Sequence, residues 1–499
     1  MHKLSLGLIA FFLGSTFILL LPGPGGMPRL ESSPARSTIR PPLAAVTAPV
    51  APNWARKYGN FLEFDTSAYR EDDYASFIQP GDDGGVVVVG AASLDSPDIP
   101  SSLFVIALDS GGLAKWSLVY GGDPAATSVN VAQGLIRTRD GGYVVIGHSA
   151  GRSSAQVLVL KVRENADSSP NGNDPYHHTS RLANLSWFMT LSQSDYDYAQ
   201  GLCETADGGI VVIGQGESGS WAVKLDPLGE VVWREGLNFS PPLPGAVLAT
   251  ADGGFILAGY NEISKFDTDG RPLWHRAYIP DNGNSNAIYG LVPADDGGFF
   301  VIGYESYHTS GDGPGWLGRI DAAGNLIWQR GFADFFPTSG SPTRDGGVLL
   351  VDNTGQILGS GAIMKCDGSG RAEWVREPDG YDAEAVFERE DGGYVFASYA
   401  YATTGSRVAV LSLDQNGNIS KGCPASRSFS IGSENPDIRV IEKPPVSVSA
   451  STVSAAAAKF PPYLRDVSAQ NLCGSDSTDQ GLGSRTQKNV HRKSPRTWR

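Results

Sequence analysis

The chain has 499 residues and carries 39 Lys and Arg residues against 53 Asp and Glu residues, a formal net charge of −14 at pH 7. This acidic balance argues against a nucleic-acid partner, which selects a basic face, and an apolar content of 41% argues against a disordered polyelectrolyte. The 62 Gly residues, the 10% aromatic content and the presence of only 4 Met residues favour a turn-rich β protein over a helical bundle.

The chain begins with a segment typical of exported proteins. A short basic start is followed by an apolar run over residues 4–21 that no charge interrupts, and by small residues at 23–25. This order is that of a secretory signal peptide, although the run is also long enough for a membrane anchor. We expect a signal peptide or anchor over residues 1–26. Prolines then recur without hydrophobic periodicity, which predicts an extended linker over residues 27–52.

A repeated Asp-Gly-Gly motif is the main signal of the sequence. It occurs seven times, 44 to 67 residues apart, and each copy is followed at once by an apolar run. Constant internal spacing with variable gaps indicates one supersecondary module that is repeated with loop insertions. The seven copies begin at Asp83, Asp140, Asp207, Asp252, Asp296, Asp345 and Asp391.

A second marker follows the apolar run in most copies. It consists of an Asp with a Gly three residues later, and in five of six such copies a Trp stands four residues beyond that Gly. Each unit therefore reads as four short strands: one before the Asp-Gly-Gly turn, the apolar run, a third strand ending at Asp-x-x-Gly, and a fourth carrying the Trp. The tryptophans are Trp116, Trp233, Trp274, Trp328 and Trp374.

Four antiparallel strands in about 45 residues match one blade of a β-propeller. We therefore predict an all-β fold, a seven-bladed propeller over residues 53–422. The last unit has no Trp after Gly417, whereas Trp54 precedes the first unit. The segment from Trp54 to Tyr58 is therefore expected to supply the fourth strand of the last blade and to close the ring.

The combined pattern resembles secreted prokaryotic propeller-repeat proteins, and the Asp-x-x-Gly-x-x-x-Trp part is distantly similar to the tryptophan-docking repeats of quinoprotein-like propellers. The resemblance implies the same architecture over residues 53–422. The Thr that usually precedes the Gly in quinoproteins is replaced, for example by Leu228 and Ala323, and no haem-attachment motif is present. The resemblance therefore implies no quinone cofactor.

Two sets of equivalent positions are candidate sites. In five of the seven units a Gly follows the apolar run, seven residues after the turn Asp. One residue past this Gly position, aromatic and polar side chains recur that suit stacking on, and hydrogen bonding to, a sugar or peptide. They could equally fill the gaps between blades. The candidate ligand-binding residues are His148, Gln215, Tyr260, Tyr304 and Tyr399.

The second set stands ten residues before the turn Asp and offers oxygen ligands for a cation such as Ca²⁺. The alternative, which the sequence favours, is that these side chains cap turns between blades. The candidates are Asp73, Asn130, Asp197 and Asn286. By contrast, a Lys or Arg recurs in the third strand so regularly that a structural ion pair is expected, at Lys161, Lys224, Lys265, Arg319 and Lys365.

The C-terminal part shows no repeat. Cys423 and Cys473 are expected to form a disulfide, which would restrict the unfolded chain by about 3–4 kcal/mol and close an irregular extended segment over residues 423–474. Residues 475–499 are basic and are expected to be a disordered tail. Cys203 and Cys366 lie in different repeats and are expected to be buried thiols.

These observations favour an exported, non-catalytic propeller, secreted, periplasmic or at the cell surface, that binds a carbohydrate or a protein. We expect a monomer with no cofactor other than Ca²⁺, and no membrane span beyond the N-terminal segment. The alternative is a polysaccharide lyase or hydrolase that uses carboxylates at the mouth of the channel, because propellers support both classes.

Overall fold

The fold is taken from a computed structural model. It describes residues 54–59, 71–94, 101–120, 129–151, 154–164, 183–217, 219–237, 244–280, 285–307, 311–332, 335–353, 361–378, 381–402 and 405–419, and short segments at 12–13, 16–17, 426–428, 433–434, 438–442, 448–450, 454–457, 463–464 and 468–471. Side chains near several gaps are not described.

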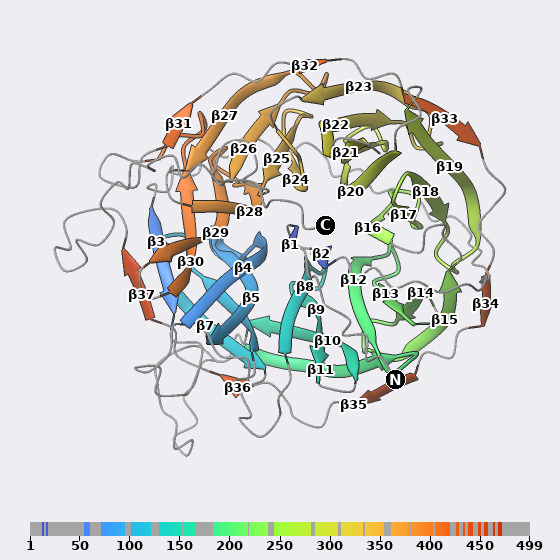
Figure 1. Cartoon of the computed structure of the whole chain (residues 1–499). Helices are drawn as coiled ribbons and strands as arrows, with labels where there is room; N and C mark the ends of the chain where they lie inside the picture. Colours follow the sequence, from blue (N-terminus) through green and yellow to red (C-terminus); the bar gives the residue numbers. More distant parts are fainter. Residues whose placement is uncertain are drawn as a thin grey trace, which may run out of the picture.

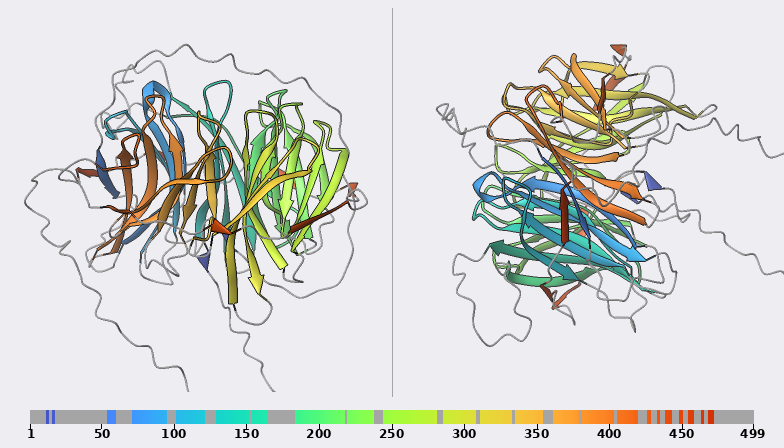
Figure 2. Two further views of the ribbon diagram at one scale, coloured as in Figure 1. Left: turned by 90° about the horizontal axis from the view of Figure 1, so that it is seen from above. Right: turned by 90° about the vertical axis from the view of Figure 1, so that its left-hand side faces the viewer.

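Seven antiparallel four-stranded blades surround a common axis, as the sequence predicts (Figure 1). Of these four strands the first is innermost and the fourth lies farthest from the axis, and the side views show the strands standing around the ring (Figure 2). Blade 1 contains β4 (Glu71–Pro80), β5 (Val86–Leu94), β6 (Ser102–Leu108) and β7 (Ala114–Tyr120). Blade 2 contains β8 (Val129–Arg137), β9 (Tyr143–Ala150), β10 (Ala155–Glu164) and β11 (Ala183–Ser192).

The next three blades repeat this order. Blade 3 contains β12 (Asp197–Glu204), β13 (Ile210–Gly216), β14 (Gly219–Leu225) and β15 (Val231–Leu237). Blade 4 contains β16 (Pro244–Ala249), β17 (Phe255–Gly259), β18 (Glu262–Phe266) and β19 (Pro272–Pro280). Blade 5 contains β20 (Ser285–Pro293), β21 (Phe299–Tyr307), β22 (Gly311–Ile320) and β23 (Leu326–Phe332).

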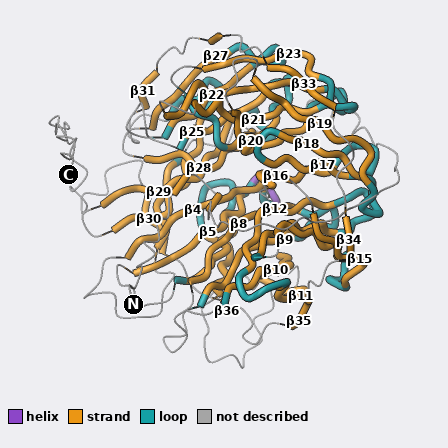
Figure 3. The backbone as a smooth tube through the Cα atoms, turned by 45° about the vertical axis from the view of Figure 1, so that its right-hand side comes forward, coloured by secondary structure: helices purple, strands orange, loops and turns teal. Residues whose placement is uncertain are grey.

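The last two blades complete the ring. Blade 6 contains β24 (Ser339–Pro342), β25 (Val348–Asp352), β26 (Ala362–Cys366) and β27 (Ala372–Pro378). Blade 7 contains β28 (Tyr381–Glu388), β29 (Tyr394–Ala402), β30 (Gly405–Leu413) and, from the other end of the sequence, β3 (Ala55–Gly59). The tube drawing shows that strands dominate and that loops connect their ends (Figure 3). Within the described residues the helical structure is one 3₁₀ turn, η2 (Asp82–Gly84).

The core lies between the blades. Seven apolar clusters each combine residues of two neighbouring blades, so every interface around the ring is packed. The second strands are buried on both faces, for example Val86–Val89 in blade 1, because each stands between two neighbouring sheets. Their continuous apolar runs in the sequence follow from this two-sided burial.

The two repeated motifs are tight turns. In the hairpin of blade 2, Gly141 has a φ of +81° and its N–H donates to the carbonyl of Thr138 at 3.0 Å. In the Asp-x-x-Gly turn of blade 3, Gly229 has a φ of +89° and its N–H donates to the carbonyl of Asp226 at 3.0 Å. Glycine adopts these left-handed conformations without steric cost, which explains why it recurs at both places.

Strand β3 closes the ring, as predicted. It pairs antiparallel with β30, with Ala55 opposite Leu411 and Tyr58 opposite Val408. Blade 7 is further joined to blade 1 by a short parallel pairing between the start of β30 and the start of β4. The seam between the two ends of the propeller is therefore a continuous hydrogen-bonded sheet.

Five tryptophans at or beside the fourth strands connect a blade to the next by packing on the Gly of its Asp-x-x-Gly turn. Trp54 packs on Gly112 in the turn of blade 1, and its indole N–H donates to the carbonyl of Ser110 at 2.8 Å. Trp274 does the same on Gly324 in the turn of blade 5, with its indole N–H 3.3 Å from the carbonyl of Ala322. Because Gly has no side chain, the indole can pack directly on the backbone of the turn, which links the turn Gly of one blade to the Trp of the blade before it.

The described parts of the C-terminal segment, expected to be irregular, are short strands. They add a fifth, outermost strand to every blade, and Figure 1 shows these strands around the periphery of the ring. They visit the blades in the order 6, 5, 4, 3, 2, 1, 7. The strands are β31 (Ser426–Ser428), β32 (Ser433–Glu434), β33 (Ile438–Glu442), β34 (Val448–Ala450), β35 (Ser454–Ala457), β36 (Tyr463–Leu464) and β37 (Ser468–Asn471).

Several expectations fall on parts of the chain that the structure does not describe. The linker, the basic tail, Cys423 and Cys473 lie outside the described residues, and of the N-terminal segment only β1 (Phe12–Leu13) and β2 (Thr16–Phe17), which pair with each other, are described. In the described part of the chain, no helix is both long enough and apolar enough to cross a membrane.

Candidate functional site

The two faces of the ring carry different groups. The Asp-Gly-Gly and Asp-x-x-Gly turns connect the first strand to the second and the third to the fourth, so they lie on one face, here called the turn face. The starts of the first strands and the ends of the second strands lie on the opposite face, here called the loop face.

On the turn face, the recurring Lys or Arg forms the expected structural ion pair with the turn Asp. In blade 2, Lys161 donates to Asp140 at 2.7 Å, while the other carboxylate oxygen of Asp140 accepts hydrogen bonds from Thr138 and from the backbone of Gly142. The same ion pair recurs in four further blades, as Lys224–Asp207, Lys265–Asp252, Arg319–Asp296 and Lys365–Asp345.

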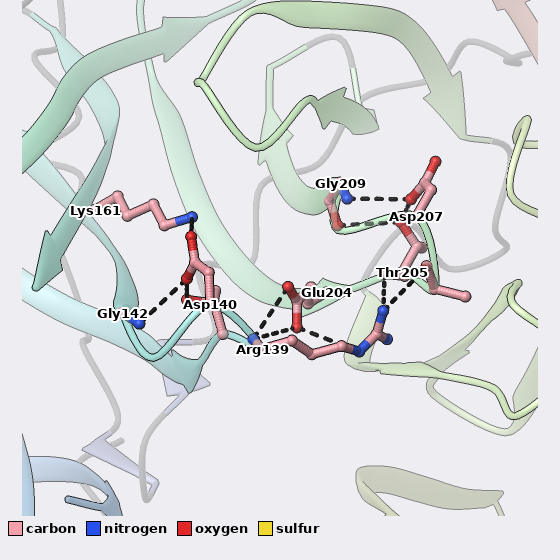
Figure 4. A network of polar contacts seen from close by, with 10 residues as sticks. Arg139, Asp140, Gly142, Lys161, Glu204, Thr205, Asp207 and Gly209 are labelled. Atoms are coloured by element: carbon pink, nitrogen blue, oxygen red, sulfur yellow. Dashed lines mark hydrogen bonds and ion pairs between the residues drawn. The ribbon is translucent and has the colours of Figure 1, made fainter. Parts of the chain in front are cut away.

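Figure 4 shows how this arrangement extends from blade 2 to blade 3. The backbone N–H of Arg139 donates to the carboxylate of Glu204 at 3.0 Å, and its guanidinium donates to the carbonyl of Thr205 at 3.0 Å. Arg344 of blade 6 makes equivalent contacts with Glu388 and Glu390 of blade 7. These groups fix turns and join blades, so they explain stability rather than ligand binding.

Blades 7 and 1 depart from this pattern. In blade 7, Ser412 stands at the position of the Lys, and Arg389 supplies the cation from the first strand by donating to Asp391 at 3.0 Å and to Ser412. In blade 1, Ala107 stands at the Lys position and the turn is η2, in which Asp83 has a φ of +54°. The ion pair is therefore a common but replaceable way of fixing the turn.

On the loop face, one of the proposed cation ligands, Asp197, caps a turn. Asp73, Asn130 and Asp197 are buried near the starts of their strands. Asp197 accepts backbone N–H donors at 2.7 Å from the loop before β12, as well as the indole N–H of Trp221 at 2.8 Å. The side chain of Asn286 is not described.

The other two residues have different contacts. Asn130 donates to the carbonyl of Ser101 at 2.8 Å, and Asp73 lies 3.8 Å from the guanidinium of Arg407. Cation binding by these groups stays a prediction. Across the residues whose side chains are described, no cluster of three or more His, Cys, Asp or Glu side chains has the arrangement of a metal site.

The innermost strands contain a feature that the sequence did not reveal. Six of them carry a β-bulge at the equivalent position, seven residues before the turn Asp. A bulge adds one residue to the strand and redirects its side chain, and bulges are common beside binding sites. The added residues are Ser76, Gln133, Gln200, Gly245, Tyr289 and Glu384.

Bulge residues meet a predicted ligand-binding residue, Tyr304, in blade 5 and the residue at the equivalent position, Asn353, in blade 6. In blade 5, Tyr289 stacks on Tyr304 with ring centroids 5.4 Å apart and planes 12° apart, and their hydroxyl oxygens are separated by 3.3 Å. Between blades 6 and 7, the amide of Asn353 donates to the carboxylate of Glu384 at 3.0 Å. All four side chains are half-buried.

His148 forms a third contact, an aromatic one, across the interface of blades 2 and 3. Its ring meets that of Tyr198 edge to face, with centroids 5.1 Å apart. Burial lowers the pKa of His148 to about 4, so the imidazole is neutral at physiological pH. We call these three contacts, Tyr289–Tyr304, Asn353–Glu384 and His148–Tyr198, the inner rim of the loop face.

The remaining predicted positions are placed differently. Gln215 is half-buried at the end of β13, and its cross-strand neighbour is Tyr198. Tyr260 has a φ of +50° in the tight loop of blade 4, where its carbonyl accepts the N–H of Ile288 at 2.6 Å and joins blades 4 and 5. Tyr399 lies on β29, and its side chain is not described.

A buried polar cluster lies outside the inner rim. Ser264 and Nδ1 of His275 are 2.6 Å apart, and Nε2 of His275 lies 3.3 Å from the carboxylate of Glu262. This contact was not predicted, although the two residues are direct cross-strand neighbours. Ser264 has an exposed fraction of 0% and burial lowers the pKa of His275 to about 4, so the cluster is sealed from substrate as it stands.

The chain matches no family model and no curated protein. Among solved structures it is similar to polysaccharide lyase Uly1 (9% identity, 68% of this chain and 90% of that chain, TM-score 0.37). It is also similar to a protein of unknown function from Dyadobacter fermentans DSM 18053 (10%, 69% and 98%, TM-score 0.35) and to the gluconolactonase XC5397 from Xanthomonas campestris (14%, 79% and 99%, TM-score 0.32). At these identities and TM-scores, none supports the transfer of an activity.

Proposed function

We propose that the protein is an exported binding propeller that takes a carbohydrate ligand at the inner rim of the loop face. The observation that carries the proposal is the stacked pair of Tyr289 and Tyr304, half-buried at a bulge of the innermost strand. Flat aromatic surfaces with a polar edge suit the apolar faces and hydroxyl groups of sugar rings.

The neighbouring contacts supply the polar part of such a site. Glu384 and Asn353 offer a carboxylate and an amide, and neutral His148 offers a ring that can donate from one nitrogen and accept at the other. Because these groups come from several blades, a ligand at the inner rim would contact the ring at several equivalent positions. A protein ligand is the alternative occupant of the same rim.

Binding is favoured over catalysis by where the perturbed carboxyl groups lie. Among the described residues, burial raises the pKa of Asp267 to about 6 and also raises the pKa values of Glu235 and Glu388. Asp267 and Glu388 lie at turns of the turn face, and Glu235 lies on the fourth strand of blade 3. None of the three is at the inner rim, where a general acid for sugar chemistry would be needed.

The proposal is tested with the full chain on a glycan array, followed by calorimetry with any glycan that binds. We expect Tyr289→Ala or Tyr304→Ala to weaken that binding about 2- to 12-fold each, since aromatic stacking contributes about 0.5–1.5 kcal/mol. Tyr289→Phe keeps the ring and should retain most of the affinity.

Leu228→Ala is the matched control, because Leu228 is exposed on the turn face and should leave binding unchanged. Folding of each variant is checked by its thermal transition. Wild-type protein that binds no glycan, or affinity that survives loss of both tyrosines, would contradict the proposal. Capture of a protein instead of a glycan, sensitive to the same two variants, would favour the alternative occupant.

A further inference from the structure

The C-terminal belt, defined here as residues 426–471, forms seven antiparallel pairings on the outer edges of the blades. Its strands contain two to five residues each. Strands this short are not stable alone, so each depends on the edge to which it is paired. The belt therefore requires the blades to be in place around the ring.

The belt covers an otherwise open set of edges. The outermost strand of a blade presents unpaired N–H and C=O groups to solvent, and such edges invite pairing with other chains. The fourth strands of all seven blades, from β7 in blade 1 to β3 in blade 7, are paired to belt strands. Figure 1 shows the belt strands following one another around the ring.

The last belt strand lies at the seam of the propeller. β37 pairs with β3, with Tyr58 opposite Ala469 and Arg56 opposite Asn471. The other edge of β3 pairs with β30. β3 thus lies between β30 and β37. It is also the one strand of blade 7 that precedes the rest of the propeller in the sequence, whereas β28, β29 and β30 come at its end.

We propose that the belt is a clasp that keeps the ring closed by holding β3 in blade 7. With both edges paired, β3 can leave the sheet only after it loses hydrogen bonds to two neighbours instead of one. The N-terminal strand would otherwise be the outermost strand at the point where the ring is completed, and thus the place where the ring opens first. The clasp acts on the ring itself and does not depend on the proposed ligand.

The test compares proline substitutions at two positions of the belt in the full chain. The N–H of Ser412 donates to the carbonyl of Trp54, so alternate residues from Trp54 to Tyr58 face β30, and Lys57 between them faces β37. Gln470→Pro therefore removes a backbone N–H that faces Lys57 at the seam, with Gln470→Ala as the control for the lost side chain, and Ala456→Pro changes β35 opposite Thr190 of blade 2. Amide hydrogen exchange is followed in β3 and in the part of β30 that pairs with it, residues 408–411. Reductant is present throughout, so that cysteine pairing does not affect the comparison.

We expect Gln470→Pro to speed exchange at least tenfold in both β3 and residues 408–411, and Gln470→Ala and Ala456→Pro to leave both nearly unchanged. If Gln470→Pro prevents folding, Gln470→Gly should give a smaller increase in the same two segments. Unchanged exchange in residues 408–411 when β37 is disturbed would overturn the proposal, because the belt would then only cover an edge. An equal effect of Ala456→Pro at the seam would also overturn it.

Discussion

The closing strand makes a direct prediction through Trp54. Its side chain is 6% exposed, packs within the apolar cluster between blades 7 and 1, and covers Gly112 so closely that a Cβ there would lie 2.5 Å from the indole. Trp54→Ala should cost about 3–5 kcal/mol, the usual range for truncating a buried aromatic residue. About 1 kcal/mol of this comes from the hydrogen bond to Ser110.

This loss of stability converts into a shift in melting temperature. Unfolding entropy of about 2.1 cal/mol/K per residue gives roughly 0.8 kcal/mol/K for a cooperative ring of about 370 residues, so Trp54→Ala should lower the Tm by about 4–6 °C. Differential scanning calorimetry measures the shift, and Trp274→Ala in blade 4 is the matched variant, since it removes the same contact inside the chain. A shift below about 1 °C for Trp54→Ala, beside a full shift for Trp274→Ala, would refute the idea that β3 stabilises the ring.

Two further predictions concern pH and cysteine chemistry. Burial alone would raise the pKa of Asp207, but hydrogen bonds from Lys224 and Thr205 hold it below its ordinary value, and Asp252 and Asp345 are lowered in the same way. Because these pKa values are lower in the folded than in the unfolded protein, the ionised carboxylates stabilise the fold fully above about pH 4, and this stabilisation is lost as the pH falls further. The free energy of unfolding, measured with urea between pH 2 and 6, should therefore fall with decreasing pH. An Asp345→Asn variant with the same pH dependence as the wild type would contradict this. Burial raises the pKa of Cys366 to about 12 and also raises that of Cys203, so neither thiol should react with iodoacetamide in the native protein. If Cys423 and Cys473 are joined, the native protein should then show no reactive thiol, and the denatured, unreduced protein should show two. Peptide mapping that finds Cys423 and Cys473 free would exclude the bridge.

The architecture could be predicted because its signals are local and repeated. A left-handed position at Gly141 or Gly229 selects glycine at a fixed offset, and the Asp beside it is fixed by hydrogen bonds within the same turn. The docking tryptophan has an equally fixed offset from that turn. Even the closure by β3 could be inferred, since the Trp absent from the last unit is present before the first.

The inner rim could be predicted only in part. Tyr304 and His148 were found because they stand one residue past a recognisable glycine, but their partners Tyr289 and Tyr198 lie in first strands that have no common residue type. The bulges share a position but not a side chain, since Ser76, Gln133 and Glu384 occupy the same place. A bulge is a property of the backbone pairing, so a single sequence gives little sign of it. The contact between Ser264 and His275 is different, because their offsets from Lys265 and Trp274 make them cross-strand neighbours and could have indicated it.

The belt was missed for a physical reason of its own. Strands of two to five residues on an outer edge need neither a buried apolar face nor a tight hairpin, so they leave no alternation and no glycine turn in the sequence. What determines them is the ring that they surround. The belt begins on blade 6 at Ser426 and ends on blade 7 at Asn471, so its two ends are on neighbouring blades after one full circuit.

That circuit gives the expected disulfide a more specific meaning. Cys423 is three residues before Ser426, and Cys473 is two residues after Asn471, so a bridge between them would join the ends of the belt to each other. A bond of this kind would turn a series of short pairings into a covalent loop around the propeller, and β37 could then move away from β3 only together with the rest of the belt. If the bridge forms, reduction should therefore speed amide exchange at the seam in the wild-type chain. It should have no such effect in a Cys423→Ser variant, in which the seam already exchanges at the faster rate. Equal exchange at the seam in oxidised and reduced wild-type protein would mean that pairing alone holds the clasp.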